Sequence, residues 1–461
     1  MTEQPHPDKT LELFGQQASA GVITPFVFCY RRPDAQDPAL LIDKLERGLV
    51  TLARAFPWTA GRVVKVESDD GLGSGVFKIR HTSRPPRVIT NDLRSSSLLD
   101  MEQFIESGCP CSSLPESIFS PYDVLPGKPD QVDARSAVMN LQANIVRGGL
   151  ILTLVGHHQV LDGTGQDQVA YWLDKACRAE AFTEEELEIG NMDREHIISP
   201  FPDSWQTPRD SRYLKQHSTG DEPSATQTKD TDTVPNDTPS AEWTDIIFPS
   251  SSLLEMKVEA NRQLESGFVS TDDALTSLIW QALARARSDR LAGDAVSTMG
   301  RAINPRRYLG IPATYPGYIS NMAFSTRSLD WLSTASLGTI ARELRKAVDP
   351  ITCDLSESTR ELATLIHRAE DKDSVSLTSA LNMKTDVMMS SWAGMRCGRF
   401  EFDLGLGPPI AVRRTLMPPV PGLMFLLPRG LDGEVVLHIC ARSDELERMK
   451  ADPAFNKYAR M

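Results

Sequence analysis

Two adjacent histidines followed by an aspartate are the residues of this chain whose types and spacing best suit chemistry. They lie in the segment GHHQVLDG at positions 156–163, directly after the apolar run GGLILTLV. A histidine has a pKa near neutrality, so His157 or His158 is a natural general base for taking a proton from a hydroxyl group. Asp162 follows His158 at i+4, and Gly163 lets the chain turn tightly.

These residues alone leave three interpretations open. Both histidines could be core-edge side chains satisfied by the backbone. His158 and Asp162 could instead bind a metal from one helix face, although no third ligand lies at a supporting spacing. In the third interpretation one histidine is a base that works without a protein nucleophile, since the chain has no Gly-x-Ser-x-Gly elbow to supply a serine.

Regular elements must position this segment on both sides. The run over 149–155 predicts a strand covered on both faces, and a helix is expected from about 165 to 178. An apolar strand over 21–30 and a helix with an apolar stripe over 41–56 precede them. Further expected elements are strands at 243–248, 423–427 and 435–440, a helix capped by Ser270 and a helix over 337–348. This mixture predicts an α/β fold.

A polar stretch divides the chain near its middle. Residues 209–239 are rich in Ser, Thr, Asp and Pro and almost lack apolar side chains, so they cannot offset the entropy of ordering. We therefore expect an N-terminal lobe over 1–205, a largely disordered linker over 206–242 and a C-terminal lobe over 243–461. A segment near 380–402 is a candidate to cross into the N-terminal lobe.

Composition excludes several classes of function. The 461 residues carry a net charge of −13, which argues against nucleic acid as a partner. No apolar run approaches the roughly 18 residues that span a bilayer, and the first residues lack a secretory signal. The seven cysteines are scattered and odd in number, which favours a reduced cytosol. Cys109 and Cys111 have no partner pair at zinc-finger spacing, so no metal is expected.

Several segments, in order, resemble one family. The motif His-His-x-x-x-Asp-Gly is typical of the acyl-CoA-dependent acyltransferases of the BAHD superfamily, and related motifs occur in condensation domains and chloramphenicol acetyltransferase. The segments PWTAGR at 57–62, NPR at 304–306, SSW at 390–392 and DLGLG at 403–407 resemble further BAHD landmarks. The likeness is strongest to the fungal trichothecene 3-O-acetyltransferases and runs from end to end, including FVSTDDALTSLIW and KADPAFNKYA.

The resemblance implies a fold and a mechanism. The fold is the two-lobed, chloramphenicol-acetyltransferase-like α/β fold, with a channel between the lobes and His158 midway along it. His158 is then the general base for direct attack of an alcohol on acetyl-CoA, and His157 is a supporting residue. Asp162 turns away and pairs with an arginine, for which Arg306 is the first choice and Arg301 the second. The resemblance implies further roles for four groups of residues: loop support by Gly163; oxyanion or channel contacts by Ser390 and Trp392; structural support by Asp403, Gly405 and Gly407; and contacts to CoA by Lys257, Ser270, Arg413 and Arg414.

The expected function is therefore acetyl transfer to a hydroxyl of a fungal secondary metabolite, with the 3-hydroxyl of a trichothecene as first choice. Acetyl-CoA is the expected cosubstrate, a small-molecule alcohol the other partner, and a cytoplasmic monomer the expected form, with no membrane partner. The alternatives are an O-acyltransferase for another polycyclic alcohol, a condensation-type amide-forming enzyme, and a non-catalytic protein that keeps the scaffold. The intact His158, Asp162 and Gly163 argue against the last of these.

Overall fold

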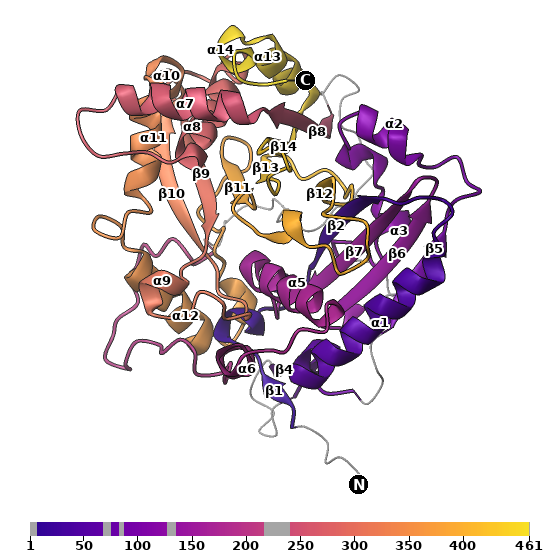
Figure 1. Cartoon of the computed structure of the whole chain (residues 1–461). Coiled ribbons are helices and arrows are strands. Elements are labelled where there is room, and N and C mark those ends of the chain that lie inside the picture. Colours follow the sequence, from indigo (N-terminus) through magenta and orange to yellow (C-terminus); the bar gives the residue numbers. More distant parts are fainter. Residues whose placement is uncertain (1–6, 68–74, 83–86, 127–134, 216–239, 461) are drawn as a thin grey trace, which may run out of the picture.

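A computed structural model describes residues 7–67, 75–82, 87–126, 135–215 and 240–460 of the chain (Figure 1). Their strands form sheets of five, six and three strands. The five-stranded sheet runs in the order β12 (Ala411–Arg413), β2 (Ile23–Arg31), β7 (Gly149–His157), β6 (Met139–Val146), β5 (Val88–Asp92). The six-stranded sheet runs in the order β10 (Asn321–Ser328), β9 (Val296–Ile303), β11 (Val387–Ser391), β13 (Leu423–Leu426), β14 (Val435–Arg442), β8 (Ala241–Phe248).

The five-stranded sheet is built around β7, which is buried along its whole length. It pairs antiparallel with β2 from Ile23↔His157 to Arg31↔Gly149. Helices α1 (Pro38–Ala55) and α5 (Gly163–Cys177) pack against each other over one face. The other face carries a second apolar cluster. Burial on both faces explains why the sequence of β7 is continuously apolar, as predicted.

One strand of the C-terminal half completes the N-terminal sheet. β12 pairs antiparallel with β2, with Val412 opposite Phe28. We expected such a crossing near 380–402. That stretch instead contributes β11 to the six-stranded sheet, between β9 and β13. Residues 396–402, which follow β11, do reach α5: the N–H groups of Cys397 and Phe402 donate to Asp167 and Asp174.

The six-stranded sheet supports the helices of the C-terminal half, α7 (Ser250–Arg262), α8 (Thr271–Ala286), α11 (Leu337–Lys346) and α13 (Ser443–Ala451). Figure 1 shows these helices gathered above the sheet, away from the N-terminal lobe. α8 is buried almost all round because α7, α11 and α13 pack around it. Such a helix needs apolar residues on every side, which its sequence provides.

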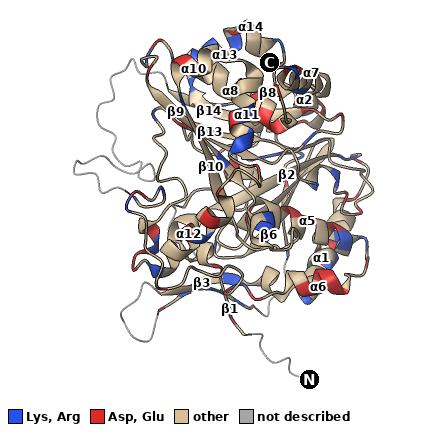
Figure 2. Cartoon of the chain, turned by 90° about the vertical axis from the view of Figure 1, so that its left-hand side faces the viewer, with Lys and Arg blue, Asp and Glu red and all other residues tan. Residues whose placement is uncertain are grey.

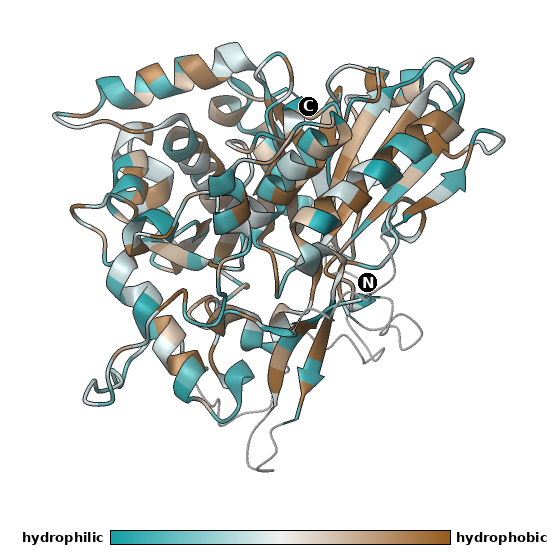
Figure 3. Cartoon of the chain, turned by 60° about the horizontal axis from the view of Figure 1, so that its bottom comes forward, coloured by the Kyte–Doolittle hydropathy of each residue, from teal (hydrophilic) through white to brown (hydrophobic). Residues whose placement is uncertain are grey.

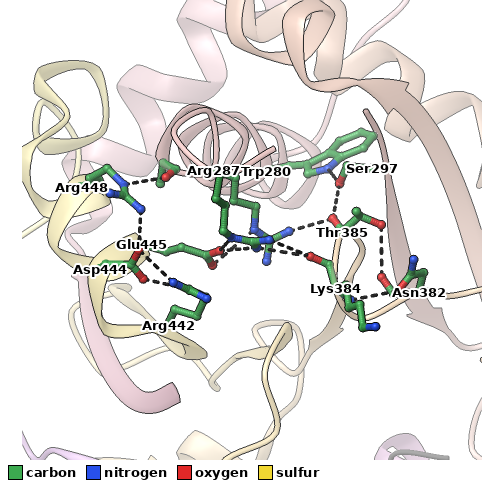
Figure 4. Close-up of polar contacts among 12 residues, drawn as sticks. Trp280, Arg287, Ser297, Asn382, Lys384, Thr385, Arg442, Asp444, Glu445 and Arg448 are labelled. Atoms are coloured by element: carbon green, nitrogen blue, oxygen red, sulfur yellow. Dashed lines mark hydrogen bonds and ion pairs between the residues drawn. The ribbon is translucent and has the colours of Figure 1, made fainter. Parts of the chain in front are cut away.

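A polar network fixes α8 and α13 to the loop before β11 (Figure 4). Arg287 at the end of α8 forms an ion pair with Glu445 and donates to the carbonyl oxygen of Thr385 at 2.8 Å. Ser297 donates to the same carbonyl at 3.0 Å and accepts from Trp280. These groups satisfy one another's hydrogen bonds. The network therefore fixes the loop that leads into β11.

The linker predicted over 206–242 is described only in part, because residues 216–239 lie outside the described residues. Before that gap, Tyr213 is fully buried and donates to Asn321 at 3.1 Å. The described residues on the C-terminal side of the gap enter β8 directly, at Ala241.

Charged and apolar residues are distributed as expected for a folded globular protein. Acidic and basic residues are interspersed along the ribbon of the described chain (Figure 2), and many apolar residues lie on the strands (Figure 3). The three-stranded sheet, of β1 (Lys9–Thr10), β4 (Val76–Arg80) and β3 (Arg62–Val66), lies near the N-terminus. Within the described ranges, no helix combines the length and the apolarity that crossing a membrane requires.

Candidate active site

The two histidines lie at the end of β7, in the turn that leads into α5. His157 is the last residue of β7, and Asp162 is the N-cap residue of α5. The Asp162 side chain accepts the N–H of Gly165 at 2.7 Å, which satisfies one of the free donors of the first helical turn. This is the predicted strand, turn and helix. It presents His158 from the rigid end of a buried strand.

The ring of His158 has a defined tautomer. Its Nδ1 lies 2.8 Å from the carbonyl oxygen of Leu161, and because a carbonyl can only accept, Nδ1 carries the proton. The other ring nitrogen, Nε2, is therefore left as a proton acceptor. Burial lowers the pKa of His158, with the Arg414 charge acting in the same direction, so the ring is neutral at pH 7. Tyr318 covers the ring, with 4.8 Å between ring centroids.

His157 is placed differently. Its side chain is buried, and within the described ranges its Nδ1 has no hydrogen-bond partner. Burial, with the charges of Arg135 and His158, lowers its pKa to about 3. His157 is thus a neutral ring in the support of the turn, and of the two histidines only His158 is partly exposed.

Asp162 and Arg306 form a buried ion pair between the halves of the chain. Arg306 Nη2 lies 2.8 Å from Asp162 Oδ2, which also accepts the N–H of Ile319 at 2.9 Å. Arg306 further donates to the carbonyls of Tyr315 and Gly317. Both oxygens of Asp162 are thus engaged, which disfavours the interpretation of Asp162 as a metal ligand.

Arg301, the second choice for this pairing, binds elsewhere. Its Nη1 lies 2.9 Å from Asp273 Oδ1, at the start of α8. Ser270 caps α8 and forms a reciprocal capping box with Asp273. A cavity of about 230 Å³ lies beside this helix start; its lining includes Ser270, Asp272, Arg301, Arg345 and Ser391.

A second buried ion pair supports the turn and was not predicted. Arg194 Nη1 lies 2.9 Å from Glu12 Oε1 and donates to the carbonyl of Val160 at 3.1 Å. Tyr315 donates its hydroxyl proton to the same Glu12 oxygen at 2.6 Å. Glu12 and Arg194 are separated by 182 positions in the sequence, and no motif marks either one.

Trp392 lies against the start of α5. Its ring packs on Phe26, with centroids 4.9 Å apart, and a Cβ added at Gly163 would lie 3.7 Å from its Nε1. That nitrogen donates to the hydroxyl of Ser390 at 3.2 Å. The SSW segment at the end of β11 therefore lies close to the end of the histidine turn.

The four residues expected to contact CoA separate into two pairs. Lys257 is exposed on α7, and Ser270 borders the cavity at the start of α8. Arg413 and Arg414 were expected to contact CoA, but both are only 4 % exposed. Arg413 donates to the backbone carbonyls of Gly108, Cys109 and Val412. Neither arginine presents its charge to the outer surface.

The DLGLG segment at 403–407 lies at the surface, and its two glycines are explained by their backbone conformation and not by tight packing. A Cβ at Gly405 or Gly407 would meet nothing within 4 Å, so close backbone approach is not their role. Both have positive φ, of 71° and 73°, which favours glycine. Asp403 forms an ion pair with Lys44 of α1 at 2.7 Å, which ties the segment to the N-terminal lobe.

Cys111 has neighbours that the sequence could not reveal. Its Sγ, a carboxylate oxygen of Asp245 and a ring nitrogen of His438 lie within 4.8 Å of one another. His438 Nδ1 is 2.5 Å from Asp245 Oδ1, and the Cys111 N–H donates to Asp245 Oδ2 at 2.6 Å. Although burial opposes the shift, the hydrogen bonds from His438 and from the Cys111 N–H, together with the more distant Arg413 charge, lower the pKa of Asp245. These hydrogen bonds engage both oxygens of the Asp245 carboxylate.

Comparison with known proteins identifies relatives over the whole length. Residues 22–177 match a family described as the trichothecene 3-O-acetyltransferase-like N-terminal domain, and residues 130–456 match the Transferase family. An O-acetyltransferase, dmxR13, of Cryptosporiopsis sp. is 36 % identical, with 98 % of this chain and 97 % of that protein covered. A trichothecene 3-O-acetyltransferase of Saccharomyces cerevisiae is also 36 % identical, with 97 % and 94 % covered.

Solved structures confirm the predicted fold. The crystal structure of Fusarium graminearum TRI101 complexed with coenzyme A and deoxynivalenol superposes with a TM-score of 0.90 at 33 % identity, covering 99 % of each chain. Vinorine synthase superposes with a TM-score of 0.65 at 14 % identity, covering 96 % of this chain and 93 % of that one, which is a likeness of fold alone. The α/β architecture is therefore a recurring one.

Proposed function

Because the chain belongs to the Transferase family, it is an acyl-CoA-dependent O-acyltransferase, and we propose that it moves an acetyl group from acetyl-CoA to a hydroxyl of a fungal secondary metabolite. The preferred acceptor is the 3-hydroxyl of a trichothecene. The observation that carries the proposal is the tautomer of His158: with Nδ1 bound to the Leu161 carbonyl, Nε2 is left as the proton acceptor of a ring that lies against Tyr318.

In the proposed reaction Nε2 of His158 removes the acceptor hydroxyl proton as the oxygen attacks the thioester carbonyl carbon. The carbonyl electron pair moves to its oxygen and a tetrahedral intermediate forms. When that pair returns, the carbon–sulfur bond breaks and the CoA thiolate takes the proton from His158. No acyl-enzyme is needed, in agreement with the missing serine elbow. Asp162 and Arg306 keep the turn in place and take no part in the proton transfer.

Ser390 and Trp392 are the proposed neighbours of the reacting carbonyl. Trp392 Nε1 donates to Ser390 Oγ, so the serine hydroxyl proton is available for another acceptor. A single preorganised donor to an oxyanion contributes about 2.7–4 kcal/mol. The Ser390→Ala enzyme should therefore lose turnover and keep its affinity for acetyl-CoA.

The cavity at the start of α8 is the proposed entrance for CoA. Ser270 and the guanidinium groups of Arg301 and Arg345 border it, together with Asp272 and Asp273, whose two negative charges balance those of the arginines. Lys257 remains a proposed outer contact. Since the chain as a whole is acidic, attraction of CoA depends on such local cations and should weaken as salt screens them.

Another polycyclic alcohol is the second candidate acceptor. The two relatives at 36 % identity carry different names, and only one name specifies a trichothecene. We also propose a monomer in the cytosol. All seven cysteines are free thiols, which supports the reduced cytosol.

The test is release of CoA thiol from acetyl-CoA in the presence of trichothecenes that bear a free 3-hydroxyl, alongside other fungal alcohols. We expect release with at least one trichothecene and its loss in His158→Ala. Release with other alcohols only would replace the acceptor and keep the enzyme class. Unchanged turnover in His158→Ala would refute the base.

A further inference from the structure

Arg414 is a buried cation without an anionic partner within the described ranges. Its guanidinium carbon lies 4.0 Å from the centre of the Phe425 ring and 4.8 Å from that of Trp392. The hydrogen bond that its guanidinium makes goes to the thioether of Met417, at a long 3.8 Å. Its Nε is buried and unpaired. A thioether is a weak acceptor, so the donors of this side chain are almost unused.

This arrangement lowers the stability of the folded state, since a buried charge normally needs a partner to offset its desolvation. The other buried arginines of the site have one: Arg306 has Asp162, and the adjacent Arg413 has three backbone carbonyls. Burial lowers the pKa of Arg414 to about 10, which still leaves it charged at neutral pH. The groups that face it are the Cys111 thiol and the Glu116 carboxylate, neither within ion-pair distance.

The aromatic contacts explain how the guanidinium is held. Rings that lie against a guanidinium face attract the cation and leave its N–H groups, which point along the edge of the plane, free to donate. Trp392 thus orients Arg414 without consuming its hydrogen bonds. The same Trp392 packs beside Gly163, which ends the histidine turn, so Arg414 lies one ring away from that turn.

We propose that Arg414 is a catalytic residue whose guanidinium donates to the thioester carbonyl oxygen as it becomes the oxyanion. This step rests on the proposed function. As the acceptor oxygen attacks, the carbonyl electron pair moves to the oxygen that faces Arg414. As the pair returns, the carbon–sulfur bond breaks and the thiolate leaves. A fixed cation in a water-poor site stabilises that developing charge more than it stabilises the neutral thioester, so it raises kcat.

The test compares Arg414→Met, Arg414→Gln and Arg414→Lys with wild type and with the exposed control Arg31→Gln. We expect kcat for CoA release to fall about 100- to 1,000-fold in Met and Gln and less in Lys, with little change in the KM for acetyl-CoA. Arg414→Met should keep or raise the melting temperature, because an apolar side chain replaces an unpaired buried charge. A structural role predicts parallel losses of stability and activity. Added guanidinium should restore part of the turnover of Arg414→Gln.

A pH profile adds a second readout. His158 faces the charges of Asp162 and Arg414, and loss of the Arg414 charge should move the acid limb of kcat/KM to higher pH. Folded variants that keep wild-type kcat overturn the inference while a His158-dependent wild type upholds the proposed function. A raised KM for acetyl-CoA at unchanged kcat also overturns it, in favour of phosphate binding. A wild type without acyl transfer to any alcohol overturns both.

Discussion

Arg306 Nη2 lies 2.8 Å from Asp162 Oδ2, and this contact links the turn that holds His158 to the opposite half of the chain. Arg306 also holds the carbonyls of Tyr315 and Gly317, while Tyr315 donates to Glu12. Glu12 in turn pairs with Arg194, which holds the carbonyl of Val160. Two buried ion pairs therefore hold the histidine turn at its two ends, and Tyr315 contacts a member of each pair.

Loss of one partner of the first pair should destabilise the protein. Asp162→Ala leaves Arg306 buried and unpaired, which typically costs about 3–5 kcal/mol of unfolding free energy. Urea unfolding followed by circular dichroism measures the change. Glu102→Ala, which removes an exposed ion pair with Arg31, is the control and should leave the unfolding midpoint almost unchanged. Equal effects in the two variants would contradict a structural role for the buried pair.

The Glu12–Arg194 pair should affect turnover through the position of the turn. Arg194→Met removes the donor to Val160 and should lower kcat, and Glu12→Gln should do so less because it keeps an oxygen for Tyr315. In the double variant the losses should not add, since both residues act on one carbonyl. Steady-state thiol release measures this, and fully additive effects would mean that the two residues act separately.

Stability should depend on pH through His157. Its pKa is about 3 in the folded protein and about 6.5 when unfolded, so between these values only the unfolded state binds the proton. The free energy of unfolding should therefore fall as pH drops below about 6.5, by up to about 1.4 kcal/mol per pH unit from this residue. His157→Gln should flatten the dependence. Denaturant titrations between pH 7 and pH 5 compare the slopes, and identical slopes would exclude the assignment.

The enzyme should stay active well below neutral pH, because His158 stays in its unprotonated form. Burial lowers the pKa of His158, so Nε2 stays unprotonated at pH values where an exposed histidine takes up a proton. We expect the acid limb of kcat/KM below pH 6.5 and a plateau above it. An acid limb at or above pH 7 would show that the measured group is not this ring in this environment.

Two glycines of α5 should differ in how strongly they respond to the same substitution. A Cβ at Gly165 would lie 2.0 Å from the backbone oxygen of Pro316, which cannot move freely. At Gly163 the nearest atom is the flexible end of Met395, at 2.7 Å. Gly165→Ala should therefore lower the melting temperature and the turnover strongly, while Gly163→Ala should be mild. Thermal unfolding and thiol release on both variants measure the difference.

Local signals explain what the sequence predicted well. The apolar run of β7, the capping aspartate of α5 and the stripe of α1 each lie within one short segment, and their elements form as expected. The pairing of Asp162 with Arg306 followed from a family resemblance. The link from Arg194 to Val160 had no such signal, because Glu12 and Arg194 lie 182 positions apart. The burial of Arg413 and Arg414 could not be predicted from the sequence, because it depends on contacts with residues of distant strands.

The position of β12 also bears on how the chain is made. During synthesis the N-terminal residues leave the ribosome first, yet the edge of their sheet beside β2 is completed only by residues 411–413. Until those residues emerge, the apolar strand β2 has one row of backbone groups unpaired, and an unpaired strand edge promotes aggregation. The nascent N-terminal half therefore needs either protection by a chaperone or rapid completion of the chain. Separate expression of the two halves should yield insoluble protein unless the second half is supplied at the same time.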